Sequence, residues 1–267
     1  MAPPSHAEIA VIGGSGFYDF LTEPREIEVE TPYGDPSAAV AVGEVAGTGV
    51  AFLPRHGRRH EFPPHRVNYR ANLWALRSVG VRRVFAPCAV GSLRPALGPG
   101  ALVVPDQLVD RTGGRTQSYM EEGAAHVPFA DPYCPSLRRV LTAVAPDIVD
   151  GGTMVVVEGP RFSTRAESQW YAQMGWSLVN MTGHPEAVLA RELALCYASI
   201  ALVTDRDAGV DEGEAVSQER VFAEFARNVD RLRGLLGAAV AGLPHQAESD
   251  CACASVWDGV RLPFELP

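Results

Sequence analysis

The chain has no lysine: all 23 of its basic residues are arginines, in a sequence of 267 residues. A Walker-type phosphate loop and Schiff-base catalysis each need a lysine side chain, so both are excluded. The basic residues are also outnumbered by 32 aspartates and glutamates, which gives a formal net charge of −9. An acidic chain of this kind argues against nucleic acid as its main partner.

Cysteines and long apolar runs are scarce as well. Five cysteines, an odd number, with no N-terminal signal sequence indicate a reducing compartment, and we expect a cytoplasmic protein. No apolar run is long enough to cross a membrane, so no membrane association is expected. Cys251 and Cys253 are one residue apart, too close for a structural zinc site without other ligands. We therefore predict no metal site, and a C-terminal tail over residues 245–267 that is disordered around these cysteines.

Short apolar runs alternate with amphipathic stretches along the chain, and no internal repeat appears. This alternation predicts a single α/β domain over residues 1–267, with its core at about 8–243. We expect a central mixed, largely parallel, twisted β-sheet flanked by helices. The expected strands cover residues 9–12, 81–87, 101–104, 108–109, 152–158, 176–181 and 197–203, with antiparallel strands within 26–53. The expected helices cover residues 68–79, 137–144, 164–174, 185–195 and 218–243.

Three loops after expected strands are rich in small or basic residues. The first is Gly13-Gly14-Ser15-Gly16, whose backbone N–H groups can converge on an anion. The second contains Arg55 and His56, and the guanidinium of Arg55 can donate to an oxyanion as a fork. The third is a small-residue turn at Cys88-Ala89-Val90-Gly91-Ser92. A plain tight turn and a solvated basic loop are the alternatives for the first two. Together with Thr182, the three loops predict an anion site.

The stretch from Asn180 to Asp207 brings the remaining polar groups to strand ends. Ligands of an α/β sheet bind at the carboxyl ends of its strands, so residues 180–182 should lie beside the 205–207 loop. Asp205 and Asp207 are two apart, and on an extended chain they face one way while Arg206 faces the other. Phe162 adds an aromatic platform at another strand end. An anion pocket, an aromatic platform and a carboxylate pair predict a nucleoside or nucleotide ligand.

Several longer motifs follow one another over residues 8–243. They are Ile-Gly-Gly-Ser-Gly at 12–16, Thr-Pro-Tyr-Gly at 31–34, Arg-His-Gly at 55–57, Val-Asn-Tyr-Arg-Ala-Asn at 67–72, Glu-Gly-Pro-Arg-Phe-Ser-Thr-Arg-Ala-Glu at 158–167, Asn-Met-Thr at 180–182 and Thr-Asp-Arg-Asp at 204–207. This set resembles the trimeric type of the purine nucleoside phosphorylase family, and within it the 5′-deoxy-5′-methylthioadenosine phosphorylases.

The resemblance implies the fold of that family and a pentosyltransferase reaction. The N-glycosidic bond of methylthioadenosine, or a related 5′-modified adenosine, would be cleaved by inorganic phosphate to adenine and 5-methylthioribose 1-phosphate. Phosphate is then a co-substrate, and no cofactor is expected. The resemblance also implies a homotrimer, in which each site is completed by a neighbouring subunit.

The family also implies roles for individual residues. The catalytic pair would be Asp205, which protonates purine N7, and Asp207, which supports the 6-amino group. We expect burial and the neighbouring charge to raise the pKa of Asp205. The phosphate-binding groups would be Ser15, Arg55, His56, Thr182 and the backbone at Ala89. The substrate-binding residues would be Phe162 and Ser163 at the base, Met181 at the ribose, and His60, Val216, Val221, Phe222 and a neighbouring subunit's His126 at the 5′ group.

Five positions depart from the family pattern. Cys88 stands where many members carry a threonine that contacts phosphate, and Gln218 and Phe222 replace smaller apolar residues near the 5′ group. Gly183-His184 resembles the methylthioinosine-type enzymes. The alternatives are therefore a 6-oxopurine nucleoside or methylthioinosine phosphorylase and, in a different class, a non-catalytic nucleoside-binding protein. Whether the 5′ group is methylthio, hydroxyl or halogen stays open.

Overall fold

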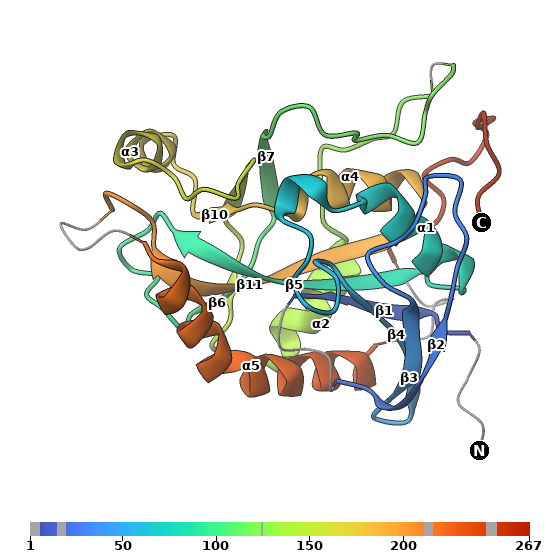
Figure 1. The fold of residues 1–267 in the computed structure, drawn as a ribbon, viewed down its shortest axis with the longest axis horizontal. Helices are drawn as coiled ribbons and strands as arrows, with labels where there is room; N and C mark the ends of the chain where they lie inside the picture. The colour runs from blue at the N-terminus through green and yellow to red at the C-terminus, as the bar shows by residue number, and fades with distance from the viewer. Residues whose placement is uncertain (1–5, 15–19, 124, 211–215, 244–249) are drawn as a thin grey trace.

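The computed structural model describes residues 6–14, 20–123, 125–210, 216–243 and 250–267. Within these ranges an eleven-stranded sheet forms the middle of the molecule. Helices α1 and α4 cover one side of the sheet, and α2 and α5 cover the other (Figure 1). The single α/β domain with a helix-flanked sheet is the architecture that the sequence predicts.

The sheet has the order β2-β3-β4-β1-β5-β10-β9-β7, and β11 pairs with both β5 and β6. Parallel pairs join β1 to β4 and β5, β5 to β11, and β9 to β7 and β10. The antiparallel strands predicted within 26–53 are confirmed for β3 and β4, whereas β2, which pairs with β3, lies mostly before this range. A further strand, β8, was not predicted. The strands are Ile9–Gly13 (β1), Thr22–Ile27 (β2), Val40–Val45 (β3), Thr48–Pro54 (β4), Arg83–Ser92 (β5), Leu102–Val104 (β6), Gln107–Arg111 (β7), Val149–Asp150 (β8), Thr153–Val157 (β9), Leu178–Asn180 (β10) and Cys196–Arg206 (β11).

The predicted turn at residues 88–92 is wrong, because β5 continues through it to Ser92. Its backbone is paired on both sides, with β11 in parallel register and with β10 at Gly91 and Ser92. This pairing satisfies the buried backbone groups, which a turn would leave without partners. A Cβ atom at Gly91 would lie 3.1 Å from Asp205 Oδ1 and 3.2 Å from Asp207 Cβ. The absence of a side chain at Gly91 therefore gives the two carboxylates room beside the strand.

The helices begin with side-chain caps where the sequence offers them. Asn68 accepts a hydrogen bond from the Ala71 N–H at the start of α1. Thr164 and Glu167 form the predicted capping box at the start of α3. Each such cap contributes about 1 kcal/mol to helix stability. The helices are Tyr69–Ser78 (α1), Pro135–Val144 (α2), Arg165–Gln173 (α3), Gly183–Glu192 (α4) and Gln218–Ala241 (α5), with a 3₁₀ turn at Pro64–Arg66.

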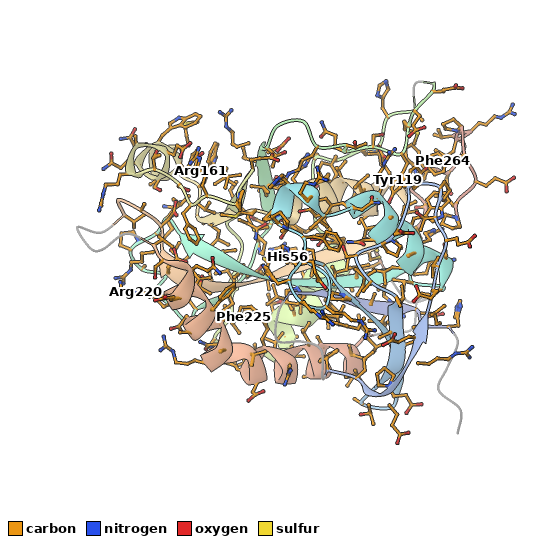
Figure 2. The ribbon with its side chains drawn as sticks, in the orientation of Figure 1. His56, Tyr119, Arg161, Arg220, Phe225 and Phe264 are labelled. Carbon is orange, nitrogen blue, oxygen red and sulfur yellow. The ribbon has the colours of Figure 1, made fainter. Side chains whose placement is uncertain are left out.

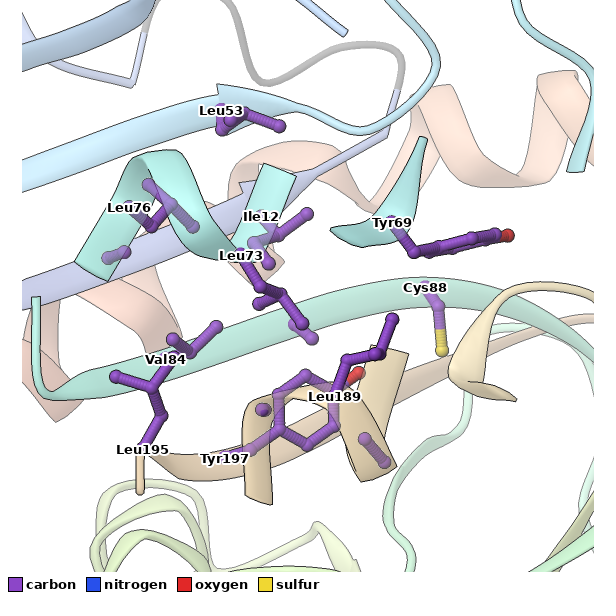
Figure 3. Packing of buried hydrophobic residues seen from close by; sticks show 14 of the residues in the cluster. Ile12, Leu53, Tyr69, Leu73, Leu76, Val84, Cys88, Leu189, Leu195 and Tyr197 are labelled. Carbon is purple, nitrogen blue, oxygen red and sulfur yellow. The ribbon is translucent and has the colours of Figure 1, made fainter. Parts of the chain in front are cut away.

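Two apolar cores lie on the two sides of the sheet. In the first, Leu73 and Leu76 of α1 and Leu189 of α4 pack with no exposed surface against sheet residues that include Ile12 and Val84 (Figure 3). In the second, residues of α2 and α5 pack on the opposite side. Burial of one such side chain contributes about 1.5–3 kcal/mol. The cores fix the strands from both faces and so position the loops at their carboxyl ends.

The C-terminal segment is ordered where it is described, so the disorder predicted around Cys251 and Cys253 is wrong for residues 250–258. Trp257 is 8% exposed and its indole N–H donates to the Glu192 carbonyl at 2.7 Å. Phe264 packs against Trp74 and Tyr119, with ring centroids 6.0 Å apart in each pair (Figure 2). Residues 244–249 lie outside the described residues. None of the described helices has the length and apolarity that a membrane crossing requires.

Candidate active site

A cavity of about 380 Å³ opens among the carboxyl ends of β1, β4, β9, β10 and β11, beside the second half of β5 and the first turns of α5. Most residues that the sequence predicts for the site line it together. These are Arg55, His56, His60, Ala89, Phe162, Ser163, Met181, Thr182, Asp205, Asp207, Val221 and Phe222.

Two predicted site residues that the structure describes, Val216 and His126, are not part of this lining. Ser15 lies outside the described residues, although its neighbour Gly14 borders the cavity. Val216 is described but is not among the lining residues. His126 is exposed, and it too is absent from the lining that the described part of the chain provides. Its assignment to a neighbouring subunit stays a prediction.

Arg55 is almost fully buried, and its guanidinium is engaged by the protein itself. Nε and Nη2 donate to the two carboxylate oxygens of Glu186, at 2.7 and 2.8 Å, and both side chains are 2% exposed. Nη2 also donates to the Ile12 carbonyl at 3.1 Å, and Nη1 donates to the Pro87 carbonyl at 3.3 Å. Burial by itself would lower the pKa of Arg55, but the charge of Glu186 outweighs it and raises the pKa. Arg55 is therefore permanently charged, and its charge is largely compensated.

This ion pair corrects the prediction that Arg55 donates to an anion as a fork. Its forked edge faces Glu186, and the Tyr197 hydroxyl also donates to Glu186 Oε1, at 2.8 Å. Four of the five guanidinium N–H groups are directed at these protein acceptors. One N–H on Nη1 is left for a ligand in the cavity. Arg55 can thus contribute a single donor and a screened charge.

His56 follows Arg55 in the chain and lines the same cavity; Figure 2 labels it. Its Nδ1 is 2.8 Å from the Phe62 carbonyl, which only accepts, so Nδ1 carries the ring hydrogen. Burial, followed by the charge of Arg55, lowers the pKa of His56 to about 4. The ring is therefore neutral near pH 7, with Nε2 unprotonated. An anion that binds beside it raises this pKa and favours protonation of Nε2.

Asn180 organises the turn after β10. Its Oδ1 accepts from the N–H groups of Thr182, at 2.8 Å, and Gly183, at 2.6 Å, and its Nδ2 donates to the Ala89 carbonyl at 3.2 Å. These bonds fix the backbone of Thr182, the N-cap residue of α4, against β5. Thr182 also borders the cavity, and its hydroxyl lies 3.5 Å from Asn180 Oδ1. Asn180 therefore positions two of the predicted phosphate-binding positions, Thr182 and Ala89.

The loop between β7 and α2 contributes a second support. Arg115 donates to the carbonyls of Met181, at 2.9 Å, and His184, at 2.7 Å. It also donates to the Glu158 carbonyl at 2.6 Å, and its side chain is 4% exposed. This one guanidinium joins the turn after β9 to the turn after β10. The irregular loop that the sequence predicts near the site thus supports the backbone of these two turns through Arg115.

Asp205 and Asp207, the predicted carboxylate pair, line the same cavity as His56. Asp207 is 4% exposed and accepts a hydrogen bond from the Ser168 hydroxyl at 2.6 Å. Burial raises the pKa of Asp207, and the Ser168 hydrogen bond opposes the shift. Arg206 points elsewhere, to the Pro95 carbonyl at 3.3 Å. The two carboxylates share the cavity while the residue between them does not, as the spacing predicts.

Asp205 has the more strongly perturbed carboxyl in the cavity. Burial is the main cause that raises its pKa; the Thr204 hydroxyl, which donates to it at 2.8 Å, opposes the shift, and the charge of Asp207 adds to it, so that the pKa is about 6. A carboxyl group with a pKa near 6 can be protonated in a useful fraction of molecules at neutral pH. The pair therefore combines a proton donor, Asp205, with a hydrogen-bonded acceptor, Asp207.

The side of the cavity next to α5 is mainly apolar. It is formed by Val221, Phe222 and Phe225 of the helix, with Gln218 at its first turn. The ring of His60 packs on Phe222, with centroids 5.9 Å apart, and stacks on His56 at 4.5 Å. Phe222 remains 44% exposed at the mouth. An apolar substituent of a ligand would be accommodated on this side.

Sequence reasoning missed several residues that shape the site: Glu186, Asn180 in its supporting role, Arg115 and Phe225. The Asn-Met-Thr-Gly sequence carried a readable signal, because an asparagine at a strand end commonly accepts from the N–H two residues on. Glu186 carried none, since its partner Arg55 is 131 residues away in the chain. His184 is 4% exposed, and its Nε2 lies 3.2 Å from Asp110 Oδ2 rather than in the cavity lining.

Comparison with known proteins gives one consistent family. The model of the phosphorylase superfamily matches residues 8–241. The chain is 62% identical to the S-methyl-5′-thioadenosine phosphorylase of Mycolicibacterium smegmatis, over 97% of this chain and 99% of that protein. It is also 59% identical to a protein of Streptomyces coelicolor named purine nucleoside phosphorylase, over 100% of both chains.

Solved structures agree with the sequence relatives. A methylthioadenosine phosphorylase from an antarctic soil metagenomic library superposes with a TM-score of 0.89 at 40% identity, over 97% of this chain and 93% of that chain. The Schistosoma mansoni methylthioadenosine phosphorylase in complex with adenine gives a TM-score of 0.87 at 36% identity, over 97% and 100% of the two chains.

Proposed function

Because the chain belongs to the phosphorylase superfamily, we propose that it cleaves the N-glycosidic bond of 5′-methylthioadenosine with inorganic phosphate. The products are adenine and 5-methylthioribose 1-phosphate. The observation that carries the proposal is that one cavity combines candidate anion donors with Asp205, whose pKa is raised to about 6. The reaction needs the anion donors and the proton donor together.

The chemistry follows from where charge develops. As the glycosidic bond breaks, positive charge grows on the sugar and negative charge grows on the departing purine. A bound phosphate faces the sugar and stabilises its positive charge before the new C–O bond forms. Asp205 gives its proton to purine N7, so that the base leaves neutral. A pKa near the working pH suits this group for donation and for reprotonation after each turnover.

Phosphate is held by donors of different kinds. The Thr182 hydroxyl, one Nη1 N–H of Arg55, the ring of His56 and the backbone at Ala89 are the groups proposed to bind it, together with Ser15 from the preceding loop. Since Arg55 is paired with Glu186 and His56 is neutral when the site is empty, the dianion meets less positive charge than the sequence suggests. Phosphate binding is therefore coupled to protonation of His56.

A 6-aminopurine fits the carboxylate pair best. Purine N7 accepts from protonated Asp205, and the 6-amino group donates to the ionised carboxylate of Asp207. A 6-oxopurine presents two acceptors on the same edge and leaves Asp207 without a donor. Such a mismatch of buried polar groups costs about 1–3 kcal/mol. Phe162 and Ser163 border the cavity and are proposed to hold the base from its other sides.

The 5′ substituent is proposed to lie against the apolar side formed by α5. Val221 and Phe222 with His60 favour a thioether over a hydroxyl, since a buried hydroxyl needs a hydrogen-bond partner. Met181 is proposed to contact the ribose. Val216 and a neighbouring subunit's His126 complete this part in the homotrimer that we propose for the active state.

A 6-oxopurine phosphorylase is the second candidate. One observation favours it: the Streptomyces coelicolor relative of 59% identity has the broader name purine nucleoside phosphorylase. Gly183-His184 does not support this second candidate, because His184 is directed at Asp110 and is not part of the cavity lining.

A matched panel of four nucleosides separates the candidates. Methylthioadenosine, adenosine, methylthioinosine and inosine vary the 5′ group and the 6 position independently. With saturating phosphate, we expect kcat/KM to be highest for methylthioadenosine, and ten- to hundredfold lower for its 6-oxo counterpart, about 1–3 kcal/mol. A higher kcat/KM for methylthioinosine than for methylthioadenosine would exclude the adenine assignment and leave the phosphorylase reaction intact.

A further inference from the structure

Four of the five cysteines form a compact group outside the catalytic cavity. The Sγ atoms of Cys134, Cys196, Cys251 and Cys253 all lie within 4.8 Å of one another. Cys134 is 0%, Cys253 4% and Cys196 7% exposed, and Cys251 is partly exposed. All four are free thiols, and the sulfurs of Cys196 and Cys251 lie 3.4 Å apart. The group is thus a nearly closed pocket of four soft ligands.

The cysteines come from three separate parts of the chain. Cys134 is the N-cap residue of α2, Cys196 is the first residue of β11, and the other two belong to the C-terminal segment. The backbone N–H of Cys134 donates to the Tyr197 carbonyl at 2.8 Å, which joins the first two elements. Ser136 and Arg139 of α2 both donate to Asp250, next to the C-terminal pair. Hydrogen bonds therefore hold the three parts together independently of the sulfurs.

We propose that this group is a structural zinc site with four thiolate ligands. Zinc–sulfur bonds of about 2.3 Å in a tetrahedron put the sulfurs about 3.8 Å apart, which the spread of at most 4.8 Å accommodates with small side-chain shifts. An iron–sulfur cluster separates its cysteine sulfurs more widely, since its own iron and sulfide atoms lie between them. A closed set of four protein ligands leaves no position for substrate, so the role is structural.

The surroundings suit the charge that such a site carries. Each cysteine releases a proton on binding, and four thiolates with one Zn²⁺ carry a net charge of −2. The N-terminus of α2, with Pro135 after Cys134, directs the positive end of the helix dipole at the sulfurs. Cys88, the fifth cysteine, pairs instead with the Ser199 hydroxyl at 3.4 Å and borders the catalytic cavity. It provides a matched control.

The metal would fasten the C-terminal segment to the body of the protein. Beyond the cysteines, the Trp257 indole N–H donates a hydrogen bond to the Glu192 carbonyl. The carboxylate of Glu192 in turn accepts from the Tyr119 N–H at 2.7 Å. Phe264 then packs on Tyr119. Cross-linking residues 134, 196 and 251–253 through one ion closes two long loops, which stabilises the fold by restricting the unfolded chain.

The test uses the full-length, untagged chain, purified under reducing conditions without chelator. Elemental analysis should find about one zinc per chain in the wild type and in Cys88→Ser, and much less in Cys251→Ser and Cys253→Ser. Co²⁺ added to metal-free wild type should give the visible and near-ultraviolet absorption of a tetrahedral thiolate complex, and Zn²⁺ should displace it. Removal of zinc should lower Tm, and added zinc should restore it.

Three results would overturn the proposal. One is a metal-free wild type whose intact mass is about 4 Da lower than that of the reduced chain, which means two disulfides instead of a metal site. Another is a reduced wild type that gives no thiolate spectrum with Co²⁺, a measurement that needs no variant to fold. The third is equal loss of zinc in Cys88→Ser and Cys251→Ser.

Discussion

The buried ion pair between Arg55 and Glu186 makes a quantitative prediction about stability. Both side chains are 2% exposed, and they share two charge-assisted hydrogen bonds of 2.7 and 2.8 Å. Removing either partner leaves the other as an uncompensated buried charge, at a cost of about 3–5 kcal/mol. We therefore expect Arg55→Met and Glu186→Gln each to lower the free energy of unfolding by this amount.

The double variant should lose far less than the sum of the two. With both charges gone, the remaining loss is that of unmade hydrogen bonds to the carbonyls of Ile12 and Pro87, about 1–3 kcal/mol each. The interaction energy of the cycle should therefore exceed about 2 kcal/mol. Urea unfolding followed by circular dichroism measures it, with protein concentration held constant because the proposed assembly makes stability concentration-dependent.

The effect of phosphate on Tm tests the Arg55–Glu186 pair in a second way. In Glu186→Gln the charge of Arg55 is no longer compensated, so a bound dianion becomes its counter-charge. We expect phosphate to raise the Tm of Glu186→Gln by more than it raises the Tm of the wild type, and to have little effect on Arg55→Met. Additive losses in the unfolding cycle, with equal phosphate effects in the three proteins, would refute the assignment of a charged, structurally coupled pair beside the anion site.

Four further predictions concern catalysis, pH and assembly. Asp205→Asn should lower kcat/KM on methylthioadenosine by about 10²–10⁴-fold, the range for loss of a general acid, and narrow or invert its lead over methylthioinosine, as a panel assay would show. Since the acidic form of Asp205 is required and its pKa is about 6, kcat/KM of the wild type should decline about tenfold per pH unit well above pH 6, and this limb should be absent from the Asp205→Asn profile. The pKa of His56 is lowered from 6.5 to about 4, so its contribution to stability is present above pH 6.5 and is lost as pH falls towards 4; His56→Asn should flatten the unfolding free energy over that window. The active species should be a trimer by light scattering, with His126→Ala raising KM for the nucleoside while folding is unchanged; a fully active monomer would contradict this prediction.

Local signals in the sequence were sufficient for much of the fold. The Thr164–Glu167 capping box and the Asn68 cap act within one helical turn, so α3 and α1 begin where the sequence predicts. The turn predicted at residues 88–92 failed for a non-local reason. Small residues resemble a turn locally, but β10 and β11 pair with this segment from both sides. Pairing with strands more than 80 residues away cannot be read from a short window.

The candidate site shows the same division. The spacing of Asp205 and Asp207 is local, and it correctly indicates that both carboxylates face one cavity. The partner of Arg55 is Glu186, 131 residues away in the chain. The sequence alone therefore could not predict that the charge of Arg55 is compensated. The cysteine group depends on three distant segments, and Cys251 and Cys253 alone look unable to hold a metal. Contacts between distant segments therefore determine the charge state around Arg55 and the assembly of the cysteine group, which local patterns do not show.

The most direct measurement of the central claim is the dependence of base release on phosphate. Purified protein is incubated with methylthioadenosine at a series of phosphate concentrations, and adenine and 5-methylthioribose 1-phosphate are quantified by chromatography. The proposed function predicts no adenine without phosphate, saturable release as phosphate rises, and equal amounts of the two products. Adenine released at the same rate without phosphate, with free methylthioribose as the sugar product, would contradict it and make the protein a hydrolase.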